Sequence, residues 1–238
     1  MKRTEVSELD QIPLAIRLKD SAVFETYLAG PNAAAIDYLR SVATATVNAG
    51  AWIWGPASSG KTHLLQAVCA AAGPSLRVAY LPLKTLSPLG PGALDGWGEH
   101  NVLALDDVDV IAGDAAFERA LFRLYNDVLE HGGLMLFSTT EAPGNLAIEL
   151  PDLASRLAAG VVFQLLALDD DERIEALKLR ARHRGFELPE ETAQYLLRRL
   201  PRDMASLYDW LDLLDVASLA AKRRLTIPFV REVLARSA

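Results

Sequence analysis

The sequence has 238 residues, of which 51% are hydrophobic and 23% are charged, and its formal net charge is −7. These proportions are those of an ordinary globular protein, and the excess of carboxylates argues against a protein that grips DNA through a broad basic surface. No apolar run is as long as a membrane span, and residues 1–5 lack the apolar core of a signal peptide, so we expect a cytoplasmic protein.

Residues 1–20 contain no strong hydrophobic period, and we expect them to form a flexible tail. Within this tail Gln11 is followed by the apolar residues Leu14 and Ile16. This spacing resembles the short peptide with which many replication proteins bind the apolar pocket of the DNA sliding clamp. Such a peptide binds through a few apolar anchors and one amide. A tail that packs on its own domain is the alternative.

The chain continues with a helical segment and then with the stretch that organises the fold. Residues 20–50 have a helical pattern, and residues 51–54 form a short apolar strand. A phosphate-loop pattern, G-x-x-x-x-G-K-[ST], comes next, and residues 63–70 have the composition of a buried helix. Strand, loop and helix in this order predict a nucleotide site rather than an accidental glycine-rich turn. The residues predicted to bind the nucleotide are Gly55, Pro56, Ala57, Ser58, Ser59, Gly60, Lys61, Thr62 and His63.

The residue types in this loop match the chemistry of a polyphosphate. Gly55 and Gly60 let the backbone turn tightly and point its N–H groups at phosphate oxygens. Lys61 supplies positive charge to the β and γ phosphates, and Thr62 offers a hydroxyl to Mg²⁺. Cys69, the one cysteine, lies among apolar residues and is expected to be a small core residue rather than a reactive thiol.

A second strand is predicted over residues 77–81, and residues 82–100, rich in glycine and proline, are expected to be irregular. Residues 101–107 form an apolar strand that ends in Asp106 and Asp107. Beside a phosphate loop in a parallel sheet, Asp106 is placed to hold Mg²⁺ and Asp107 to polarise an attacking water. A turn initiated by two aspartates is the alternative.

The rest of the chain separates into strands and then helices. Asp114 is predicted to cap a helix, and residues 134–137 and 161–165 form two further strands. The first of these strands is followed by polar residues up to Thr140, which can sense a γ-phosphate or simply form a turn. After residue 169 only helices are predicted, and they cover residues 171–184, 189–200, 204–221 and 228–235.

This order of elements predicts an α/β fold with three parts. Residues 1–20 are the tail, residues 21–167 a nucleotide-binding core with a parallel five-stranded sheet, and residues 168–238 a small α-helical lid.

Together these parts resemble the AAA+ ATPases, and the whole chain resembles their DnaA-related branch. Residues 24–27 and 30–32 look like the N-terminal motif that helps to form the adenine pocket in that branch, and residues 122–126 continue the match. The Gln11 peptide also lies where one family of this branch, the Hda family of DnaA inactivators, carries its clamp-binding sequence. Further segments that resemble this family are residues 150–157, 179–182, 184–189 and 225–230.

The resemblance implies roles for three residues. Arg156 would be an arginine finger that acts on a nucleotide held by a neighbouring subunit, Arg202 the sensor arginine of the lid, and Thr140 the sensor of the strand. Without the family match, either arginine would be interpreted as part of a surface ion pair. The implied cofactors are ADP or ATP with Mg²⁺. The implied partners are the sliding clamp and ATP-bound DnaA, and self-association is left open.

The sequence therefore favours a negative regulator of DNA replication initiation that stimulates hydrolysis of DnaA-bound ATP. The alternative is a AAA+ ATPase that hydrolyses its own ATP as a helicase loader or DNA-remodelling factor, with the same nucleotide site. The clamp peptide favours the regulator, as does the end of the sequence at Ala238, which leaves no room for the DNA-reading domain of DnaA. A small-molecule kinase is disfavoured by the lid and the finger segment. Whether the protein hydrolyses its own ATP stays open.

Overall fold

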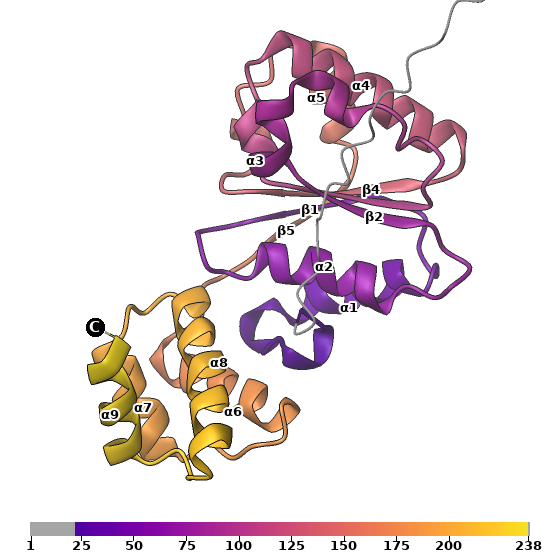
Figure 1. The fold of residues 1–238 in the computed structure, drawn as a ribbon. Coiled ribbons are helices and arrows are strands. Elements are labelled where there is room, and N and C mark those ends of the chain that lie inside the picture. The colour runs from indigo at the N-terminus through magenta and orange to yellow at the C-terminus, as the bar shows by residue number, and fades with distance from the viewer. Residues whose placement is uncertain (1–21, 238) are drawn as a thin grey trace, which may run out of the picture.

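The structure is a computed structural model that describes residues 22–237. The predicted clamp-binding residues Gln11, Leu14 and Ile16 lie outside the described residues. The described chain forms a layered α/β core followed by a bundle of helices (Figure 1). The predicted fold class, a parallel five-stranded core with a helical lid, is confirmed.

The core is built on a sheet in which every pair of neighbouring strands is parallel, in the order β2-β3-β4-β1-β5. β1 lies inside the sheet, with Ala51 opposite both Leu136 of β4 and Val161 of β5. Parallel pairing brings the carboxyl ends of all strands to one edge, where the predicted site residues follow their strands. The strands are β1 (Ala51–Trp54), β2 (Val78–Pro82), β3 (Val102–Asp106), β4 (Leu134–Thr139) and β5 (Val161–Gln164).

Helices cover both faces of the sheet, and a separate group of helices forms the lid (Figure 1). The helices α1 (Ala33–Ala43) and α2 (Lys61–Ala71) lie on one face, and α3 (Leu83–Leu86), α4 (Ala115–Glu130) and α5 (Pro151–Leu157) lie on the other. The lid helices are α6 (Asp170–His183), α7 (Glu190–Arg199), α8 (Met204–Ala221) and α9 (Ile227–Ser237). Short 3-10 turns are η1 (Phe24–Thr26), η2 (Gly30–Asn32), η3 (Ser87–Leu89), η4 (Pro91–Leu94), η5 (Val108–Ile111) and η6 (Pro143–Asn145).

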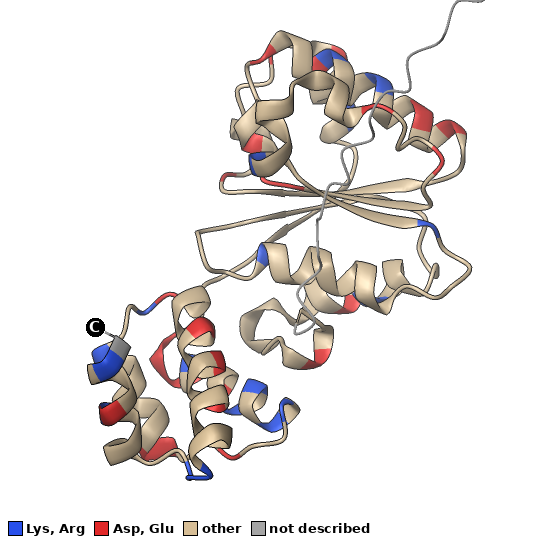
Figure 2. Cartoon of the chain, in the orientation of Figure 1, with Lys and Arg blue, Asp and Glu red and all other residues tan. Residues whose placement is uncertain are grey.

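The apolar side chains form one cluster on each face of the sheet and a third inside the lid. Successive residues of β1 point to opposite faces, so Trp52 packs with Leu121 of α4 while Ile53 packs with Leu64 of α2. Asp106 is the only charged residue in the five strands, and Figure 2 shows the charges of both signs on the helices and on the loops that connect the elements. None of the helices in the described chain is long and apolar enough to cross a bilayer.

The segment between β2 and β3 is more regular than predicted. Residues 82–100 were expected to be irregular, but α3, η3 and η4 lie within them. Leu83, Leu86 and Leu94 are fully buried and anchor these turns to the core, which local glycine and proline content does not reveal. Asp114 caps α4 as predicted, because its carboxylate accepts hydrogen bonds from the backbone N–H groups of Ala116 and Phe117.

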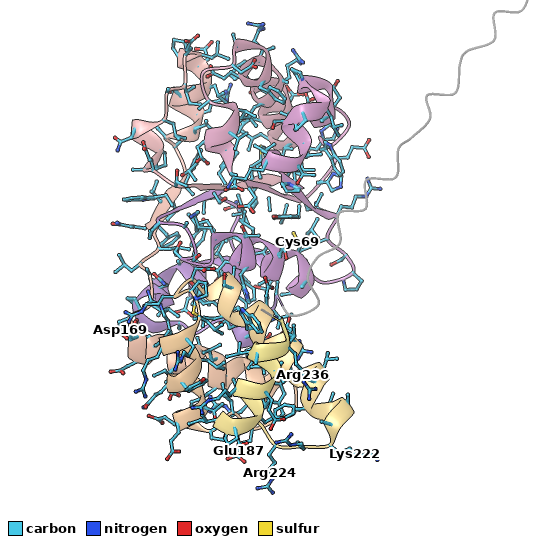
Figure 3. The ribbon with its side chains drawn as sticks, turned by 60° about the vertical axis from the view of Figure 1, so that its left-hand side comes forward. Cys69, Asp169, Glu187, Lys222, Arg224 and Arg236 are labelled. Carbon is cyan, nitrogen blue, oxygen red and sulfur yellow. The ribbon has the colours of Figure 1, made fainter. Side chains whose placement is uncertain are left out.

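Cys69 lies in α2 within the core (Figure 3). Its side chain is buried, and burial raises the pKa of the thiol to about 12. The structure therefore agrees with the interpretation of Cys69 as a packing residue rather than a reactive thiol.

Candidate nucleotide site

The phosphate loop lies at the carboxyl edge of the sheet, between β1 and α2. Two of its glycines adopt backbone conformations that other residues rarely reach, with φ of 155° at Gly55 and 90° at Gly60. A β-carbon on Gly60 would collide with the ring of Tyr27, and one on Gly55 would collide with the carbonyl oxygen of Leu165. The loop therefore needs glycine at both positions, as the motif predicts.

A cavity of about 390 Å³ opens beside this loop, between the core and the lid. Residues 57–63 line it, together with Asp107 and Thr140, so most of the residues predicted to bind nucleotide share one wall. Tyr27 and the lid residue Tyr208 supply an aromatic side. A cavity of this size, with a polar end and an aromatic side, has the dimensions and chemistry of a small-molecule site.

Lys61 is buried at the bottom of the loop, where its Nζ donates hydrogen bonds to the carbonyl oxygens of Gly55 (2.7 Å) and Pro56 (2.9 Å). Gly55 and Pro56 thus support the site by holding Lys61. Burial lowers the pKa of Lys61, and the carboxylates of Asp107 and Asp106 oppose this shift. A phosphoryl group in the cavity would favour the charged form of Lys61 further.

Asp106, at the end of β3, accepts hydrogen bonds from the hydroxyl groups of Thr62 (2.7 Å), Tyr80 (2.7 Å) and Ser138. The first of these bonds brings together the two residues predicted to hold Mg²⁺. Mg²⁺ takes oxygen ligands and is usually bound by one or two protein groups together with phosphate oxygens and water. A hydroxyl beside a carboxylate fits that role. Within residues 22–237, no group of three His, Cys, Asp or Glu side chains forms a metal site of its own.

Tyr80 is a part of the site that sequence reasoning missed, and Ser138, one of the polar residues at the end of its strand, has a contact with Asp106 that the sequence did not predict. Tyr80 stands two residues before Pro82, which pairs with Asp106 across the sheet, and its pKa is raised by burial and by the Asp106 carboxylate. The Ser138 hydroxyl also accepts a hydrogen bond of 2.9 Å from the backbone N–H of Asp107. These contacts fix the Asp106 carboxylate from two neighbouring strands, and they could be found only once the strand order was known.

Asp107 and Thr140 line the cavity, but each is engaged by another side chain. The Asp107 carboxylate accepts a hydrogen bond of 2.9 Å from Nζ of Lys84, a residue that the sequence did not single out. Burial raises the pKa of Asp107 and Lys84 opposes that shift, while the same contact raises the pKa of Lys84. The Thr140 hydroxyl donates a hydrogen bond of 2.8 Å to the carboxylate of Asp109.

In the lid, Arg180 rather than Arg202 lines the cavity. The buried guanidinium of Arg180 pairs with Asp212 at 2.9 Å and lies 4.5 Å from the ring centre of Tyr208. Arg202, the predicted sensor, is exposed and pairs with Asp170 at 3.2 Å. It borders a smaller hollow of about 260 Å³ whose wall also includes residues 57–58 of the phosphate loop.

The basic residues of the lid differ in whether they form ion pairs with carboxylates of the lid. Arg184 is exposed but, like Arg180, pairs with carboxylates of the lid, with Asp212 at 2.6 Å and with Asp215 at 2.8 Å. Lys222 and Arg224 lie instead at the end of the lid far from the sheet (Figure 3). The basic run at 180–184 is therefore partly internal to the lid.

The N-terminal motif ties the phosphate loop to the segment that leads into the lid. Tyr27 donates a hydrogen bond of 2.8 Å to the carbonyl oxygen of Ser59 and accepts one from Asn32. Asn32 exchanges two hydrogen bonds with the backbone of Leu166, of 3.0 and 2.8 Å. Burial raises the pKa of Tyr27 to about 12, so this hydroxyl keeps its proton and stays a donor.

Arg156 stands apart from this cavity. It lies on α5, is exposed, and is absent from the cavity lining. Its guanidinium carbon lies 5.5 Å from the ring centre of Phe122 and 5.8 Å from that of Tyr125, both on α4. No carboxylate in the described part of the chain forms an ion pair with it. The two rings therefore orient the guanidinium group of Arg156, and no carboxylate among the described residues neutralises its charge.

Glu118, which the sequence did not single out, supports the helix that carries Arg156. Its fully buried carboxylate accepts hydrogen bonds from the backbone N–H groups of Gly113 (2.8 Å), Glu149 (3.0 Å) and Leu150 (2.8 Å). Leu150 is the N-cap residue of α5. Glu118 therefore fixes the start of the Arg156 helix against α4.

Comparison with known proteins gives two kinds of match. Residues 170–234 match the family model of the Hda lid domain. The fold is similar to domain III of the replication initiation protein DnaA from Thermotoga maritima (TM-score 0.76, 23% identity, covering 92% of this chain and 98% of that chain).

Two further solved structures extend the likeness. AMPPCP-bound DnaA from Aquifex aeolicus has a TM-score of 0.65 and 21% identity over 83% of this chain and 66% of that chain. The RuvB Holliday junction branch migration motor of Thermotoga maritima has a TM-score of 0.61 and 17% identity over 85% of this chain and 68% of that chain. At these identities the structural matches establish a shared fold alone, and function has to be argued from the site.

Proposed function

Because the chain joins an AAA+ fold shared with DnaA domain III to a lid of the Hda family, we propose that it is a negative regulator of DNA replication initiation. In this proposal it binds an adenine nucleotide and stimulates hydrolysis of the ATP bound to DnaA. The observation that carries the proposal is the Hda lid match over residues 170–234, behind a phosphate loop with a complete motif. Residues 21–167 then serve as the nucleotide-binding core and residues 168–238 as the lid.

The cavity between core and lid supports binding of ADP or ATP. Lys61 offers a buried positive charge, and the Ser59 hydroxyl is buried with no hydrogen-bond partner in the described residues. A phosphate oxygen would satisfy that hydroxyl. Thr62 and Asp106 would hold Mg²⁺, which supplies charge neutralisation to the phosphates. The base would lie toward Tyr27, since this side of the cavity is aromatic.

Arg156 is the residue we propose to act on the partner. An arginine finger stabilises the negative charge that develops on the γ-phosphoryl group during hydrolysis. A finger that serves a neighbouring subunit has to be exposed, oriented and free of a competing carboxylate. The position of Arg156 over the rings of Phe122 and Tyr125 satisfies these conditions among the described residues. Thr140 and Arg202 are kept in this proposal as sensors of the bound nucleotide.

Docking on the DNA sliding clamp would bring Arg156 to its partner. We assign this to the peptide with Gln11, Leu14 and Ile16, which rests on the sequence alone. A regulator that acts on the initiator at replicating DNA works in the cytoplasm of a bacterial cell, which is where we place it.

The test is the rate of ATP hydrolysis by purified DnaA with and without this protein, ADP and DNA-loaded clamp. We expect stimulation that needs the clamp and that a Gln11→Ala variant loses. A Lys2→Ala variant, changed in the same tail but outside the peptide, is the matched control. No stimulation, together with strong hydrolysis by this protein alone, would overturn the proposal.

That second outcome would favour the alternative, an AAA+ motor or loader that hydrolyses its own ATP. The observation in its favour is that Thr62 is hydrogen-bonded to Asp106, while Lys61 and Asp107 line the same cavity. The likeness to RuvB, a branch migration motor, is one of fold alone. Stimulation of its own ATP hydrolysis by single-stranded or branched DNA would be the signature of this alternative.

A further inference from the structure

One side of the lid helix α8 is apolar and open to solvent. Leu213, Val216 and Leu219 are 41%, 64% and 71% exposed, and they are the only exposed large apolar residues in the described parts of α6–α9. Their spacing of three residues places them on one side of the helix. The opposite side is buried inside the lid through Leu211 and Leu214. Within the described chain, α8 therefore has a second apolar side that no other element covers.

The two ends of this side carry opposite charges. Asp209 is exposed one turn before the apolar residues, and Lys222 is exposed directly after the end of α8. Neither forms an ion pair with another described residue, although their neighbours Asp212 and Arg223 both do. The helix runs from the nucleotide cavity, which Asp209 lines, to the far end of the lid, where Lys222 lies (Figures 1 and 3). The exposed side is thus acidic at one end, apolar in the middle and basic at the other end.

This pattern is complementary to itself when two copies of α8 pack antiparallel. A two-fold axis at Val216 places each residue opposite the one that lies equally far on the other side of Val216 in the second copy. Leu213 then faces Leu219 of the second copy. Asp209 precedes Val216 by about 10 Å along the helix and Lys222 follows it by about 9 Å, so the two unpaired charges meet across the axis. A parallel arrangement would instead bring like charges together.

We propose that the exposed side of α8 is a docking surface for a second copy of this chain, which forms an antiparallel pair of lids. The α8 helix has 18 residues, so the contact is about 27 Å long and smaller than a standard protein interface. We therefore expect a weak pair, with a dissociation constant of about 10 to 100 µM. This inference does not depend on the nucleotide site.

The position of the lid makes such a pair compatible with the proposed function. The lid lies on the side of the sheet that α2 covers, whereas α5, with Arg156, lies on the other side (Figure 1). Contact through α8 would leave Arg156 of both copies exposed to partners.

An isolated exposed apolar residue gives no reason to expect such a contact, because single residues of this kind are ordinary on protein surfaces. Leu129 is an example. It is 44% exposed and is the only exposed large apolar residue of α4. Leu129→Asp therefore provides a matched control that adds a carboxylate at an exposed apolar position outside the lid.

The first experiment measures the oligomeric state of the purified full chain by sedimentation velocity, from about 1 µM to about 200 µM, a range that spans the expected dissociation constant. We expect the wild type to pass from monomer to dimer. Val216→Asp places two carboxylates together at the two-fold axis, so the dissociation constant should rise at least about tenfold. Leu129→Asp should associate like the wild type. A urea denaturation curve for each variant checks that it is folded.

The second experiment reverses the charges at the two ends. Asp209→Lys and Lys222→Glu should each weaken self-association about three- to tenfold, because each places like charges opposite one another in both halves of the pair. Mixing the two variants should restore association, since each lysine of the first then faces a carboxylate of the second. A merely structural effect of either substitution would not be reversed by mixing.

A wild type that stays monomeric over the whole range would overturn the inference and leave this side of α8 to a different protein. A dimer that Val216→Asp leaves intact would also overturn it, because the contact would then lie elsewhere. Failure of the mixed charge variants to associate better than either alone would contradict the antiparallel arrangement. Since oligomeric state is the only readout, none of these outcomes bears on the stimulation of DnaA.

Discussion

The phosphate loop and the Arg156 helix hold their charged side chains in opposite ways. At the loop Lys61 is buried and donates hydrogen bonds to two carbonyl groups, and Asp106, at the end of the neighbouring β3, accepts hydrogen bonds from three hydroxyl groups. On α5, Arg156 is exposed and lies over two aromatic rings. The two regions also lie on opposite faces of the sheet, since α2 covers one face and α5 the other (Figure 1).

The molecule therefore has an inward region, the polar cavity beside the phosphate loop, and an outward region, the exposed arginine of α5. The inward site is enclosed by core and lid, and its polar groups are already arranged around a ligand-sized cavity. The outward arginine is oriented but left without a counter-charge in the described chain, which suits a partner that brings its own negative charge. Four variants separate the two regions.

Arg156→Ala tests the outward region alone. We expect it to lower stimulation of DnaA-bound ATP hydrolysis about 10³-fold or more, because an arginine finger contributes about 10³ to 10⁵ to the rate. Binding of ADP to the variant should be unchanged. Arg119→Ala is the matched control, since it removes another exposed arginine, on α4. Normal stimulation by Arg156→Ala, measured in the DnaA assay, would show that the finger is a different residue.

Glu118→Ala tests whether the outward region depends on buried support. The variant leaves the backbone N–H groups of Glu149 and Leu150 without their acceptor, so we expect a loss of about 3 kcal/mol in the free energy of unfolding. Glu118→Gln should be intermediate, because the amide keeps one acceptor oxygen. Urea denaturation measures both, with Glu130→Gln on the exposed end of α4 as the control. A change below about 0.5 kcal/mol would contradict the assigned role.

Lys61→Ala tests the inward region. Loss of a buried ammonium group that faces phosphate should weaken ADP binding about 10- to 100-fold, as expected for a hydrogen bond to a charged group. Titration calorimetry measures the affinity, and Lys222→Ala, at the far end of the lid, should bind like the wild type. Unchanged affinity in Lys61→Ala would mean that the cavity does not bind phosphate through this loop.

Phe122→Leu makes the smallest change to the outward region. The variant keeps an apolar side chain of similar size but removes one of the two rings beneath Arg156. Cation–π contacts at exposed sites contribute about 0.5–1 kcal/mol, so stimulation should fall about two- to fivefold. Leu129→Ala, an exposed apolar position on the same helix, is the control. If Phe122→Leu had the full effect of Arg156→Ala, the ring would have to contact the partner directly.

The sequence predicts the strands and the phosphate loop because their signals are local. Each strand is a short apolar run bounded by turn residues, and the phosphate-loop motif lies within eight positions, 55–62. The pairing of Thr62 with Asp106 followed from the rule that parallel strands end at one edge.

The residues that the sequence did not yield depend on contacts between distant segments. Tyr80 and Lys84 gain their roles from the strand order, which places the end of β2 beside β3. From the sequence alone, Glu118 is an ordinary glutamate of a helix. Its role is visible only in the folded chain, where it accepts a hydrogen bond from the backbone at the start of α5. From the sequence alone, Arg180 would be interpreted as a solvent-exposed residue of a lid helix, but it lines the cavity. Arg202 instead pairs with Asp170 outside the cavity. Such placements follow from tertiary packing, which no local pattern encodes.

In the proposed function, this protein acts on a nucleotide held by its partner rather than on its own. The most direct measurement loads DnaA with labelled ATP, loads this protein with unlabelled ADP, and follows the labelled ADP formed in the presence of DNA-loaded clamp. We predict rapid conversion with the wild type and with Asp107→Asn, and none above background with Arg156→Ala. Conversion that needs Asp107 but tolerates Arg156→Ala would contradict the claim.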